Sequence, residues 1–326
     1  MKNFEYVRPG SVAQAVQALD QRGAMPLAGG MDMVPGMQDN VIDADRVVNL
    51  KSIQDDGIRG IRETDGGLVI GALTTLTEIA EHPVVQSQYA ALAEATLEVG
   101  SPQIRNVGTL GGNLCQRPRC WYFRSEHYKC LKKGGPRCFA ADDEAENQYN
   151  AILGGGPAYI VHPSNCASAL VALNATFHVA GPDGPRAVHA DDFFVLPTER
   201  LLQENVLRQG EIVTHVEIPE PPDGSKSAFL ETSERAGFDW GISGAAVAGV
   251  VRDGVITSPR IVLYAVAPIP WRATDAEAEI DGKPLNEGNI RAAGEAALAG
   301  AEPLSNNGYK VPLTKTMVRR ALARLA

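Results

Sequence analysis

The sequence has no stretch that approaches the roughly 18 consecutive apolar residues of a membrane-spanning helix. The first residues, MKNFEYVRPGSVAQAV, contain no apolar run behind the early lysine, so the pattern of a secretory signal is also missing. Basic residues are fewer than acidic ones, 30 against 39, which disfavours a general nucleic-acid binder. We therefore expect a cytoplasmic chain with no nucleic-acid partner and no membrane span.

Several catalytic motifs are absent as well. The six histidines show no HExxH or other zinc-enzyme spacing, and no GxSxG nucleophile elbow occurs. The glycine-rich segments match neither GxGxxG after a strand nor the P-loop pattern GxxxxGK followed by Ser or Thr. Hydrolases, zinc enzymes, NAD-binding Rossmann folds and P-loop NTPases are therefore disfavoured. We assign no catalytic residue to this chain.

Helix and strand patterns alternate without an internal repeat, which predicts an α+β protein. Apolar residues at helical spacing after Ser11, a suitable N-cap, predict a helix over 12–19. The segment 220–227 holds two prolines and an Asp-Gly turn after a strand-like run, and it is the best candidate for a domain boundary. We expect a larger N-terminal domain over 1–222 and a smaller C-terminal domain over 223–326.

The remaining elements follow from the same patterns. A helical region broken near Pro83 is expected over 77–97, and antiparallel strands are expected around the turn Asp253-Gly254. Tyr159 and Trp240 are expected to be core aromatics. Short strands are predicted at 47–50, 68–73 and 158–161, and a final amphipathic helix with Val318, Ala321, Leu322 and Leu325 on one face.

Two glycine-rich segments carry the first chemical signal. Gly29 and Gly30 follow an apolar run, and Gly108, Gly111 and Gly112 crowd into a second loop. Glycine lets the backbone approach a ligand closely and adopt positive φ, so that successive N–H groups can converge on an anion. A pyrophosphate is the expected guest. On the pattern alone, a pair of tight turns without a ligand is the alternative.

Cysteine is scarce, with five residues, which disfavours a disulfide scaffold, yet four lie in the 24 residues from 115 to 138. Their spacing, C-x4-C-x9-C-x7-C, suits four-cysteine sites for zinc or for a 4Fe-4S cluster. The paired CxxC motifs usual for zinc are missing. Cys166 lies apart from the others, and we interpret it as a buried helical cysteine.

The cysteine window, residues 115–138, is also strongly basic. It contains seven lysines and arginines against one acid, Glu126. Nearby cations lower thiol pKa values and raise the reduction potential of a cluster, so the charge favours the 4Fe-4S interpretation. The alternative is a set of reduced cysteines beside a solvated basic surface.

Together, the glycine segments and the cysteine window resemble the FAD-binding medium subunit of the molybdenum hydroxylases, the xanthine dehydrogenase and aldehyde oxidoreductase family. The likeness runs through nearly the whole chain, in FEYVRPGSVAQAV, PLAGGMDMVPGM, SPQIRNVGTLGGNL, IVHPSNCASALVAL and YKVPLTKTMVRRAL. RCWYFR followed by further cysteines is similar to the branch whose flavin subunit carries a 4Fe-4S cluster. Bacterial periplasmic aldehyde oxidoreductase and 4-hydroxybenzoyl-CoA reductase belong to that branch.

This resemblance implies the two-subdomain FAD-binding fold of the vanillyl-alcohol-oxidase/CO-dehydrogenase flavoprotein type, with a cluster insertion at about 115–140, plus a smaller C-terminal α+β domain. The implied FAD-binding residues are Ala28, Gly29, Gly30, Met31, Asp32 and Met33 on one side of the pyrophosphate, Thr109, Gly111, Gly112 and Asn113 on the other, and Ser164 and Asn165 near the flavin. The implied cluster ligands are Cys115, Cys120, Cys130 and Cys138, with Cys166 as the alternative to Cys115. The chain departs from the family's pattern at Asn165, Glu231 and Ser233.

The resemblance also implies a function in electron transfer. A large subunit with molybdopterin cytosine dinucleotide would oxidise an aldehyde or an N-heterocycle such as a purine. A small subunit with two 2Fe-2S clusters would pass the electrons to FAD in this chain, and from there to an external acceptor. The compartment would be the periplasm if a partner with a signal exports the heterotrimer. The alternatives are an assembly subunit with a structural metal site and no redox-active flavin, and a free-standing flavoprotein oxidase.

Overall fold

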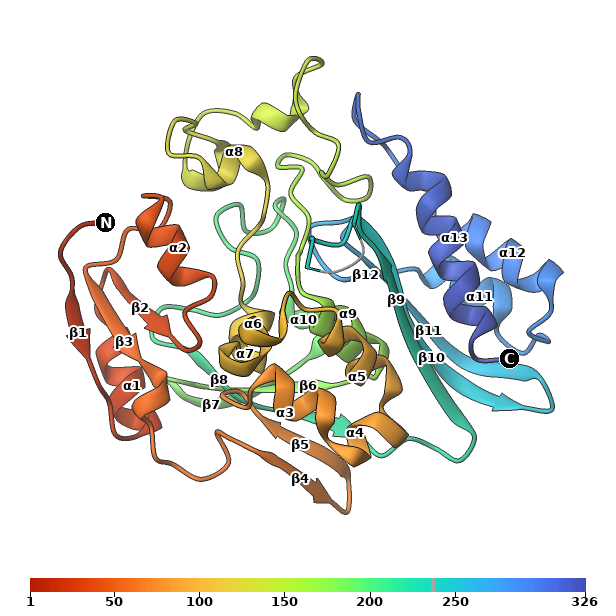
Figure 1. Ribbon diagram of the computed structural model, residues 1–326, viewed down its shortest axis with the longest axis horizontal. Coiled ribbons are helices and arrows are strands. Elements are labelled where there is room, and N and C mark those ends of the chain that lie inside the picture. Colours follow the sequence, from red (N-terminus) through yellow and green to blue (C-terminus); the bar gives the residue numbers. More distant parts are fainter. Residues whose placement is uncertain (236–237) are drawn as a thin grey trace.

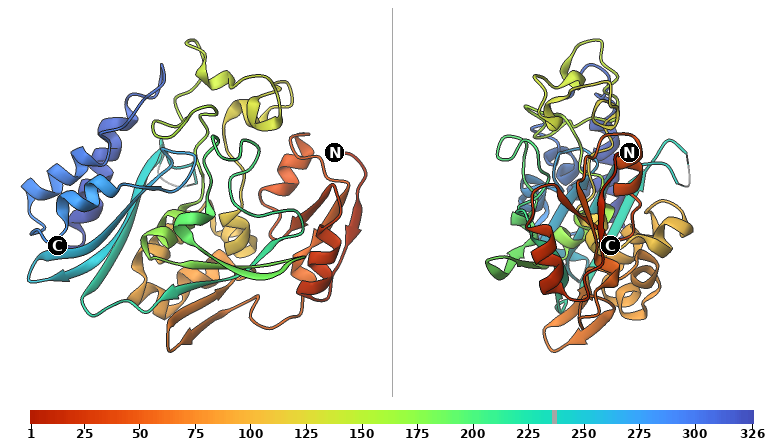
Figure 2. Two further views of the ribbon diagram at one scale, coloured as in Figure 1. Left: turned by 180° about the vertical axis from the view of Figure 1, so that it is seen from behind. Right: turned by 90° about the vertical axis from the view of Figure 1, so that its left-hand side faces the viewer.

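The computed structural model describes residues 1–235 and 238–326. In this part of the chain, three β-sheets lie side by side, with the second sheet in the middle and the two chain ends on opposite sides (Figures 1 and 2). No helix among these residues is both long and apolar enough to cross a membrane. The mixture of helices and sheets, with a separate C-terminal sheet, confirms the predicted α+β class.

The first sheet is small and parallel, with strand order β1-β3-β2. Its helix α1 starts where the sequence predicts, because Ser11 Oγ accepts a hydrogen bond from the backbone N–H of Gln14. Ala15 and Leu19 on this helix are buried against the sheet. The elements are β1 (Glu5–Val7), α1 (Val12–Leu19), β2 (Ala24–Leu27), α2 (Met33–Gln38), β3 (Arg46–Asn49) and a 3₁₀ turn, η1 (Leu50–Ser52).

The second sheet has five antiparallel strands in the order β4-β5-β8-β6-β7. Its strands are β4 (Ile61–Thr64), β5 (Gly67–Gly71), β6 (Thr176–Gly181), β7 (Gly184–His189) and β8 (Ile212–Pro219). Helices cover one face (Figure 1): α3 (Leu76–Glu81), α4 (Pro83–Gln88), α5 (Ala90–Leu97), α6 (Pro102–Val107), α7 (Leu110–Leu114), α9 (Asn165–Ala172) and α10 (Ala190–Phe193). Alternate residues such as Ile70, Phe177 and Val216 form the main core beneath these helices.

The third sheet is antiparallel, in the order β12-β11-β10-β9. The hairpin turn at Asp253 and Gly254 has positive φ at both residues, 53° and 76°, as a two-residue hairpin turn requires. The strands are β9 (Ser225–Thr232), β10 (Ser243–Arg252), β11 (Val255–Tyr264) and β12 (Trp271–Arg272), and the helices are α11 (Thr274–Ile280), α12 (Glu287–Ala296) and α13 (Lys310–Ala323). The predicted hairpin and final helix are therefore confirmed.

Sheets two and three share one core. Phe229 and Tyr264 of the third sheet are buried together with residues of the second. The backbone N–H of Phe229 also donates to Glu94 on α5 at 2.7 Å. The segment 220–224 therefore connects two sheets that pack directly on one another.

The prediction of a strand at residues 158–161 is wrong. This stretch has no regular strand partner among the described residues, because its hydrogen bonds go singly to loops. The carbonyl of Tyr159 accepts from Ala151, and the nearby N–H of His162 donates to Ala267 at 2.9 Å. Pro163, which has no N–H, then ends the stretch.

The cysteine window forms the top of the molecule in Figure 1, above both glycine loops. It contains α8 (Trp121–Arg124) and a short 3₁₀ turn, η2 (Leu131–Lys133), and a second 3₁₀ turn, η3 (Phe139–Ala141), follows it directly. The segment after it is tied to residues 305–310, which lead into α13. Asn307 donates to the carbonyls of Asn150 and Ala151 at 3.1 and 3.2 Å, and Lys310 Nζ donates to Asn150 and to Ala265.

Candidate cofactor site

The two glycine loops lie directly against one another. The first, residues 28–32, follows β2, and the second, residues 108–113, spans the start of α7. A Cβ atom on Gly29 would lie 2.3 Å from the carbonyl oxygen of Val107 and 2.9 Å from Cα of Gly108. No side chain fits there, so the contact between the loops requires glycine at this position.

The first loop presents backbone donors that have no protein acceptor. Gly30 has a φ of 77°, a conformation that favours glycine, and it turns the chain from β2 into α2. Among the hydrogen bonds of the described residues, the N–H groups of Gly29, Gly30, Met31 and Asp32 donate to no protein atom. Successive donors of this kind suit an anionic group such as a pyrophosphate. Met33 follows as the first residue of α2.

The second loop is held against the second sheet. Thr109 caps α7, since its Oγ1 accepts from the N–H of Gly112 at 3.2 Å. The N–H of Gly111 donates to the carbonyl of Ala72 at 2.8 Å, and a Cβ on Gly111 would lie 3.1 Å from Cβ of Ala72. Gly111 is therefore required by packing against the end of β5.

The start of α9 meets the second loop. Ser164 Oγ donates to Oδ1 of the buried Asn113 at 2.5 Å and accepts from the N–H of Ala167 at 3.0 Å. The structure therefore brings the predicted residues Asn113 and Ser164 into contact, although they are 51 residues apart.

Asn165 is hydrogen-bonded to Glu231, and both residues are positions at which the sequence departs from the pattern of the family that it resembles. Its side-chain amide donates to Glu231 at the end of β9. Burial, together with the neighbouring Glu98 carboxylate, raises the pKa of Glu231 to about 8. This carboxyl group is therefore largely protonated at neutral pH. Ser233, the other departure in this segment, donates its hydroxyl to the carbonyl of Arg235.

Asp32 connects the first glycine loop to the cysteine window. Its carboxylate accepts from Arg119 and Arg124, each at 2.6 Å, and from the backbone N–H of Arg117 at 2.8 Å. Burial raises the pKa of Asp32, but the two guanidinium groups outweigh burial and hold the pKa below its usual value. The side chain of Asp32 thus holds the window, while its backbone belongs to the loop.

Three cysteines of the window form one group. The backbone of Cys130 pairs in an isolated bridge with Arg137, the residue before Cys138, and a charge on Cys138 contributes to raising the pKa of Cys120 and Cys130. Aromatic rings pack around the group: Phe139, next to Cys138, stacks on Tyr122 with 6.0 Å between ring centroids. We refer to Cys120, Cys130 and Cys138 as the cysteine group.

Polar groups lie near two sulfurs of the cysteine group. Burial raises the pKa of Cys120 and of Cys130, and backbone N–H groups two and three positions later in the chain oppose this shift in both. The Asn150 amide also donates to Sγ of Cys120 at 3.6 Å. Donors aimed at sulfur stabilise the thiolate, which is the form that binds metal.

Cys115 and Cys166 lie in a different environment. Cys115 packs against the main core, and burial, with the Glu204 carboxylate nearby, raises its pKa to about 12. Cys166 is fully buried in α9 beside Thr96, and burial raises its pKa to about 12 as well. The interpretation of Cys166 as a buried helical cysteine is confirmed.

The spacing of the cysteines disfavours zinc. Tetrahedral coordination with Zn–S bonds of about 2.3 Å brings the sulfurs to about 3.8 Å from one another. In the described residues, no three cysteine sulfurs lie within 4.8 Å of one another. The described cysteines are therefore not arranged as the ligands of one tetrahedral zinc ion.

Two acids from outside the window pair with four of its seven basic residues. Glu204 contacts Arg117 Nε at 2.7 Å and Lys132 Nζ at 2.8 Å, and Asp32 pairs with two further arginines. Both acids lie outside the window in the sequence. Only the fold brings them next to it.

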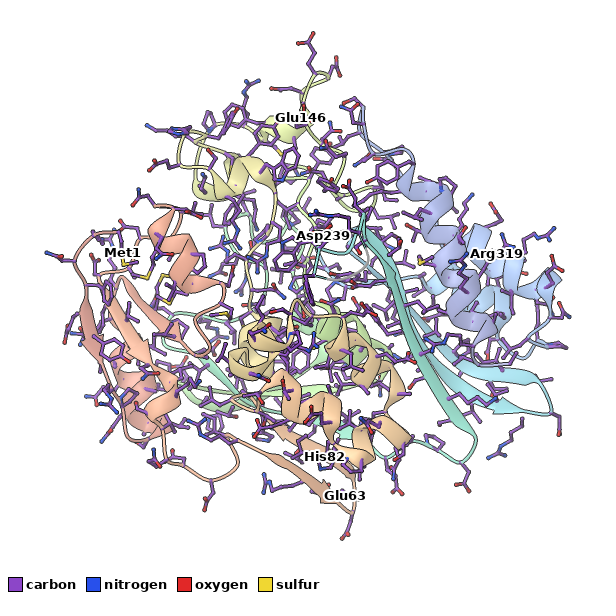
Figure 3. All side chains as sticks on the ribbon, in the orientation of Figure 1. Met1, Glu63, His82, Glu146, Asp239 and Arg319 are labelled. Carbon is purple, nitrogen blue, oxygen red and sulfur yellow. The ribbon has the colours of Figure 1, made fainter. Side chains whose placement is uncertain are left out.

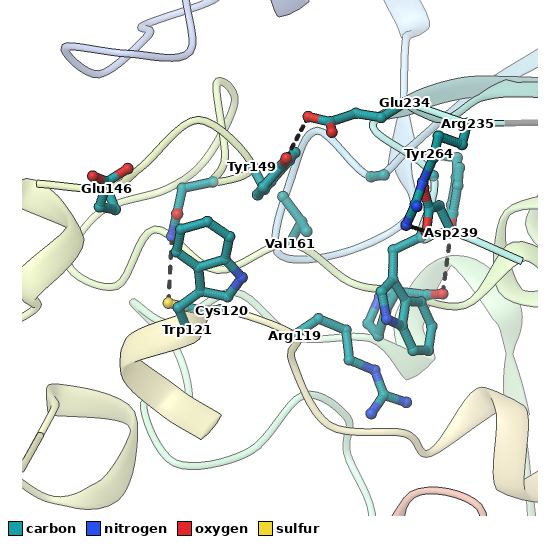
Figure 4. Close-up of a pocket in the computed structure, with 15 residues that line it drawn as sticks. Arg119, Cys120, Trp121, Glu146, Tyr149, Val161, Glu234, Arg235, Asp239 and Tyr264 are labelled. Atoms are coloured by element: carbon teal, nitrogen blue, oxygen red, sulfur yellow. Dashed lines mark hydrogen bonds and ion pairs between the residues drawn. The ribbon is translucent and has the colours of Figure 1, made fainter. Parts of the chain in front are cut away.

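A cavity of about 240 Å³ opens beside the cysteine group (Figure 4). Arg119 and Cys120 line it on one side, and Trp240 and Tyr264 on the other. The Arg119 guanidinium lies over the Trp240 ring, 4.1 Å from the centroid. Two acids on its rim, Glu146 and Asp239, lie between the window and the third sheet (Figure 3).

The role expected for Trp240 is wrong. Its side chain is 53% exposed and borders this cavity, so it is no core aromatic, whereas Tyr159 is half-buried. The sequence around Trp240 contains no signal that distinguishes an aromatic residue lining a cavity from one in the core.

Comparison with known proteins identifies both halves of the chain. Residues 2–221 match the family described as "FAD binding domain in molybdopterin dehydrogenase", and residues 228–325 match the "CO dehydrogenase flavoprotein C-terminal domain". The aldehyde oxidoreductase FAD-binding subunit PaoB of Escherichia coli is 33% identical over 99% of this chain and 98% of its own length. The carbon monoxide dehydrogenase medium chain of Hydrogenophaga pseudoflava is 30% identical over 98% of this chain and 96% of its own.

Solved structures agree with the sequence matches. The carbon monoxide dehydrogenase of Hydrogenophaga pseudoflava aligns with a TM-score of 0.77 and 29% identity, covering 98% of this chain and 96% of that one. Reconstituted CO dehydrogenase from Oligotropha carboxidovorans aligns with a TM-score of 0.78 and 27% identity, covering 99% and 98%. The architecture of this chain is therefore that of the medium chains of these enzymes.

Proposed function

Because the chain belongs to the FAD-binding medium subunits of the molybdenum hydroxylase family, which includes CO dehydrogenase and aldehyde oxidoreductase, we propose that it carries FAD and a 4Fe-4S cluster in a three-subunit electron-transfer complex. Residues 1–222 form the FAD-binding domain and 223–326 the C-terminal domain in this proposal. The partners are a large subunit with molybdopterin cytosine dinucleotide and a small subunit with 2Fe-2S clusters.

One observation carries the FAD assignment: two glycine loops from different sheets touch at Gly29, and the first offers successive N–H groups without acceptors. The residues that hold the pyrophosphate in this proposal are Ala28 to Met33 on one side and Thr109 to Asn113 on the other. Ser164 keeps Asn113 in place through its 2.5 Å hydrogen bond, and Asn165 keeps Glu231 beside the flavin.

The chain's residues position and shield its cofactors. Bound FAD supplies a group that collects single electrons and releases them in pairs, which suits the proposed route from 2Fe-2S clusters to an external acceptor. Asp32 holds the first glycine loop and the window at a fixed separation through Arg119 and Arg124. The cavity lined by Cys120 and Trp240 then gives an acceptor access beside the cysteine group.

The cluster ligands in this proposal are Cys120, Cys130, Cys138 and Cys115. The first three are supported by the electrostatic effect of Cys138 on the other two and by the hydrogen bond from the Asn150 amide to Sγ of Cys120. Cys115 is the fourth cysteine of the window, and it must lose a proton from a buried thiol to bind iron. Cys166 is the alternative fourth ligand.

The substrate class in this proposal is an aldehyde or an N-heterocycle, oxidised in the large subunit with oxygen from water and the release of two electrons and two protons. The relatives include the nicotinate dehydrogenase FAD-subunit of Eubacterium barkeri and PaoB of Escherichia coli, whose names cover both classes. The complex works in the cytoplasm, or in the periplasm if a partner directs its export.

The test is the visible spectrum of the native complex purified through a tag on this chain. We expect two partner subunits to copurify, one larger and one smaller than this chain. The spectrum should show flavin bands and a broad iron–sulfur shoulder, and the substrate should bleach both. The isolated chain should keep both chromophores but not respond to substrate. A colourless chain that contains stoichiometric zinc would instead identify a structural assembly subunit.

A further inference from the structure

A group of metal-ligating side chains lies on the second sheet, away from the cysteine window. His178 on β6 is directly paired with His215 on β8, and Glu217 follows two positions later on β8. Side chains alternate between the two faces of a strand, so these three share a face. The intervening Val216 and the neighbouring Phe177 are fully buried in the core on the other face. The three polar groups therefore line the face opposite the helices.

The ligand atoms are at the separation that a metal ion requires. One imidazole nitrogen from each histidine and one carboxylate oxygen all lie within 4.8 Å of one another. Nε2 of His178 is 2.9 Å from Oε2 of Glu217, and Nε2 of His215 is 3.9 Å from Oε1. Two ligands of a tetrahedral ion with bonds of about 2.0–2.1 Å stand about 3.3 Å apart. Side-chain rotations that turn the two imidazole rings toward a common point would complete the site.

A buried nitrogen in this group has no hydrogen-bond partner. Nε2 of His178 is shielded from solvent, and its angle to Glu217 makes no hydrogen bond despite the 2.9 Å separation, so it is unsatisfied within the described residues. A buried polar atom without a partner is costly. A metal ion between His178 and Glu217 would satisfy both.

A β-bulge fixes the tautomer of His215. The register between β6 and β8 shifts after His178, which leaves Thr214 as the extra residue on β8. Its hydroxyl lies 3.2 Å from the carbonyl oxygen of His178, which can only accept, and 3.1 Å from Nδ1 of His215. The hydroxyl hydrogen therefore goes to the carbonyl, and Nδ1 of His215 donates to Oγ1. Nε2 of His215 then carries the lone pair that a metal needs.

The two imidazole rings of the group lie face to face. They stack nearly parallel with their centroids 4.2 Å apart. The lone pair of an imidazole nitrogen lies in the plane of its ring, so one ion binds both histidines only after the rings turn out of this stack.

We propose that His178, His215 and Glu217 bind a divalent first-row transition-metal ion. Two imidazoles and one carboxylate form the ligand set of many Zn²⁺ sites, and they leave coordination positions for water or a further ligand. Thr214 is a positioning residue, because it orients His215 through Nδ1. This site is independent of the proposed FAD and cluster sites.

The experiment uses the flavin-containing full chain, stripped of adventitious metal with a chelator and titrated with Zn²⁺. We expect one saturable site, X-ray absorption with nitrogen and oxygen at about 2.0–2.1 Å, and the scattering pattern of two imidazoles. His178→Ala and His215→Ala should each weaken binding at least tenfold, and Thr214→Val about tenfold. His189→Ala, a histidine on the same face of the adjacent strand β7, should leave the affinity unchanged.

Three results would overturn the proposal. These are no saturable binding, a sulfur shell at about 2.3 Å that places the zinc on cysteines, and His178→Ala binding as tightly as the parent chain. The absorption spectrum of the unsubstituted chain decides the matter if the alanine variants do not fold.

Discussion

At the scale of single residues, Gly29 is where the first glycine loop tolerates least change. Gly29→Ala places a methyl group 2.3 Å from the carbonyl oxygen of Val107, so the two loops must separate. We expect at least tenfold weaker FAD binding, measured as flavin content after purification and by titration of the apoprotein, because the donors of one loop no longer face the other. Gly300→Ala, which meets no atom within 4 Å, is the matched control. Full flavin content in Gly29→Ala would show that the loops do not share the ligand.

Glu231 determines a pH dependence of stability. Its pKa is about 8 in the folded chain, against an ordinary value of 4.5. Between these values the folded state binds more protons than the unfolded state, so the free energy of unfolding falls as the pH rises from about 4.5 to 8. Glu231→Gln should remove this contribution, and chemical denaturation between pH 5 and 8 should show the variant gaining on the parent chain as the pH rises.

The control for this prediction is the exposed Glu220, where Glu220→Gln should follow the parent profile throughout. Parallel profiles for the parent chain and Glu231→Gln would mean that this carboxyl group is already ionised at low pH.

Residues of the candidate site could be predicted from the sequence where a single short segment contains the whole signal. Gly29 and Gly30 could be singled out because a glycine pair after an apolar run has few structural uses. Asp32 could also be assigned to the first loop, but its pairing with Arg119 and Arg124 could not, because those residues are 87 and 92 positions away. For the same reason, the pairing of Glu204 with Arg117 and Lys132 could not be predicted.

At the scale of elements, the conformation of the cysteine window depends on bound ligands and on the neighbouring segments. Cys130→Ser should lose most of the bound iron, since it removes one of the proposed cluster ligands, and should leave FAD largely bound, because Cys130 lies outside both glycine loops. Iron and flavin content of the purified variant are the measurements. A full complement of iron in Cys130→Ser would rule out this cysteine as a ligand.

Cys115→Ser and Cys166→Ser distinguish the candidates for the fourth ligand. We expect iron loss in Cys115→Ser and unchanged iron in Cys166→Ser, whose sulfur lies within α9 against Thr96. The reverse result would assign the fourth position to Cys166.

Elements were predictable where local chemistry and burial agree. The hairpin at Asp253-Gly254 follows from a turn that needs positive φ, and α13 follows from apolar residues at helical spacing. The stretch 158–161 has strand-like residues, but no neighbouring strand is available to it. Strand pairing depends on the rest of the fold, so local composition alone gave the wrong prediction there.

At the scale of the whole molecule, the three sheets act together through long-range contacts. Asn307 is fully buried and donates to the carbonyls of Asn150 and Ala151, which connects the third sheet's helices to the segment behind the window. Asn307→Ala removes the donor to the buried carbonyl of Ala151 and one of the donors to Asn150, whose carbonyl still accepts from Lys310, and it should destabilise the chain by about 1–3 kcal/mol. Thermal or chemical unfolding measures the loss, and iron content should fall with it.

The exposed residue Asn289 provides the control, since Asn289→Ala removes only a surface hydrogen bond on α12. Equal stability of the two variants would show that the contact between residues 307 and 150 contributes nothing to the fold.

The α+β class and the presence of a C-terminal domain were predictable from the sequence. The core shared between sheets two and three was not, because a boundary-like segment does not reveal whether the domains on either side pack together.

The hydrogen bonds between residues 147–151 and 305–310 also set an order of events during biosynthesis. Partners that are 156 to 161 residues apart cannot meet until the later one has left the ribosome. The segment behind the cysteines therefore stays open through most of translation and closes only when residues 305–310 arrive. Full enclosure of any inorganic group between those cysteines is, by this timing, a late step of maturation.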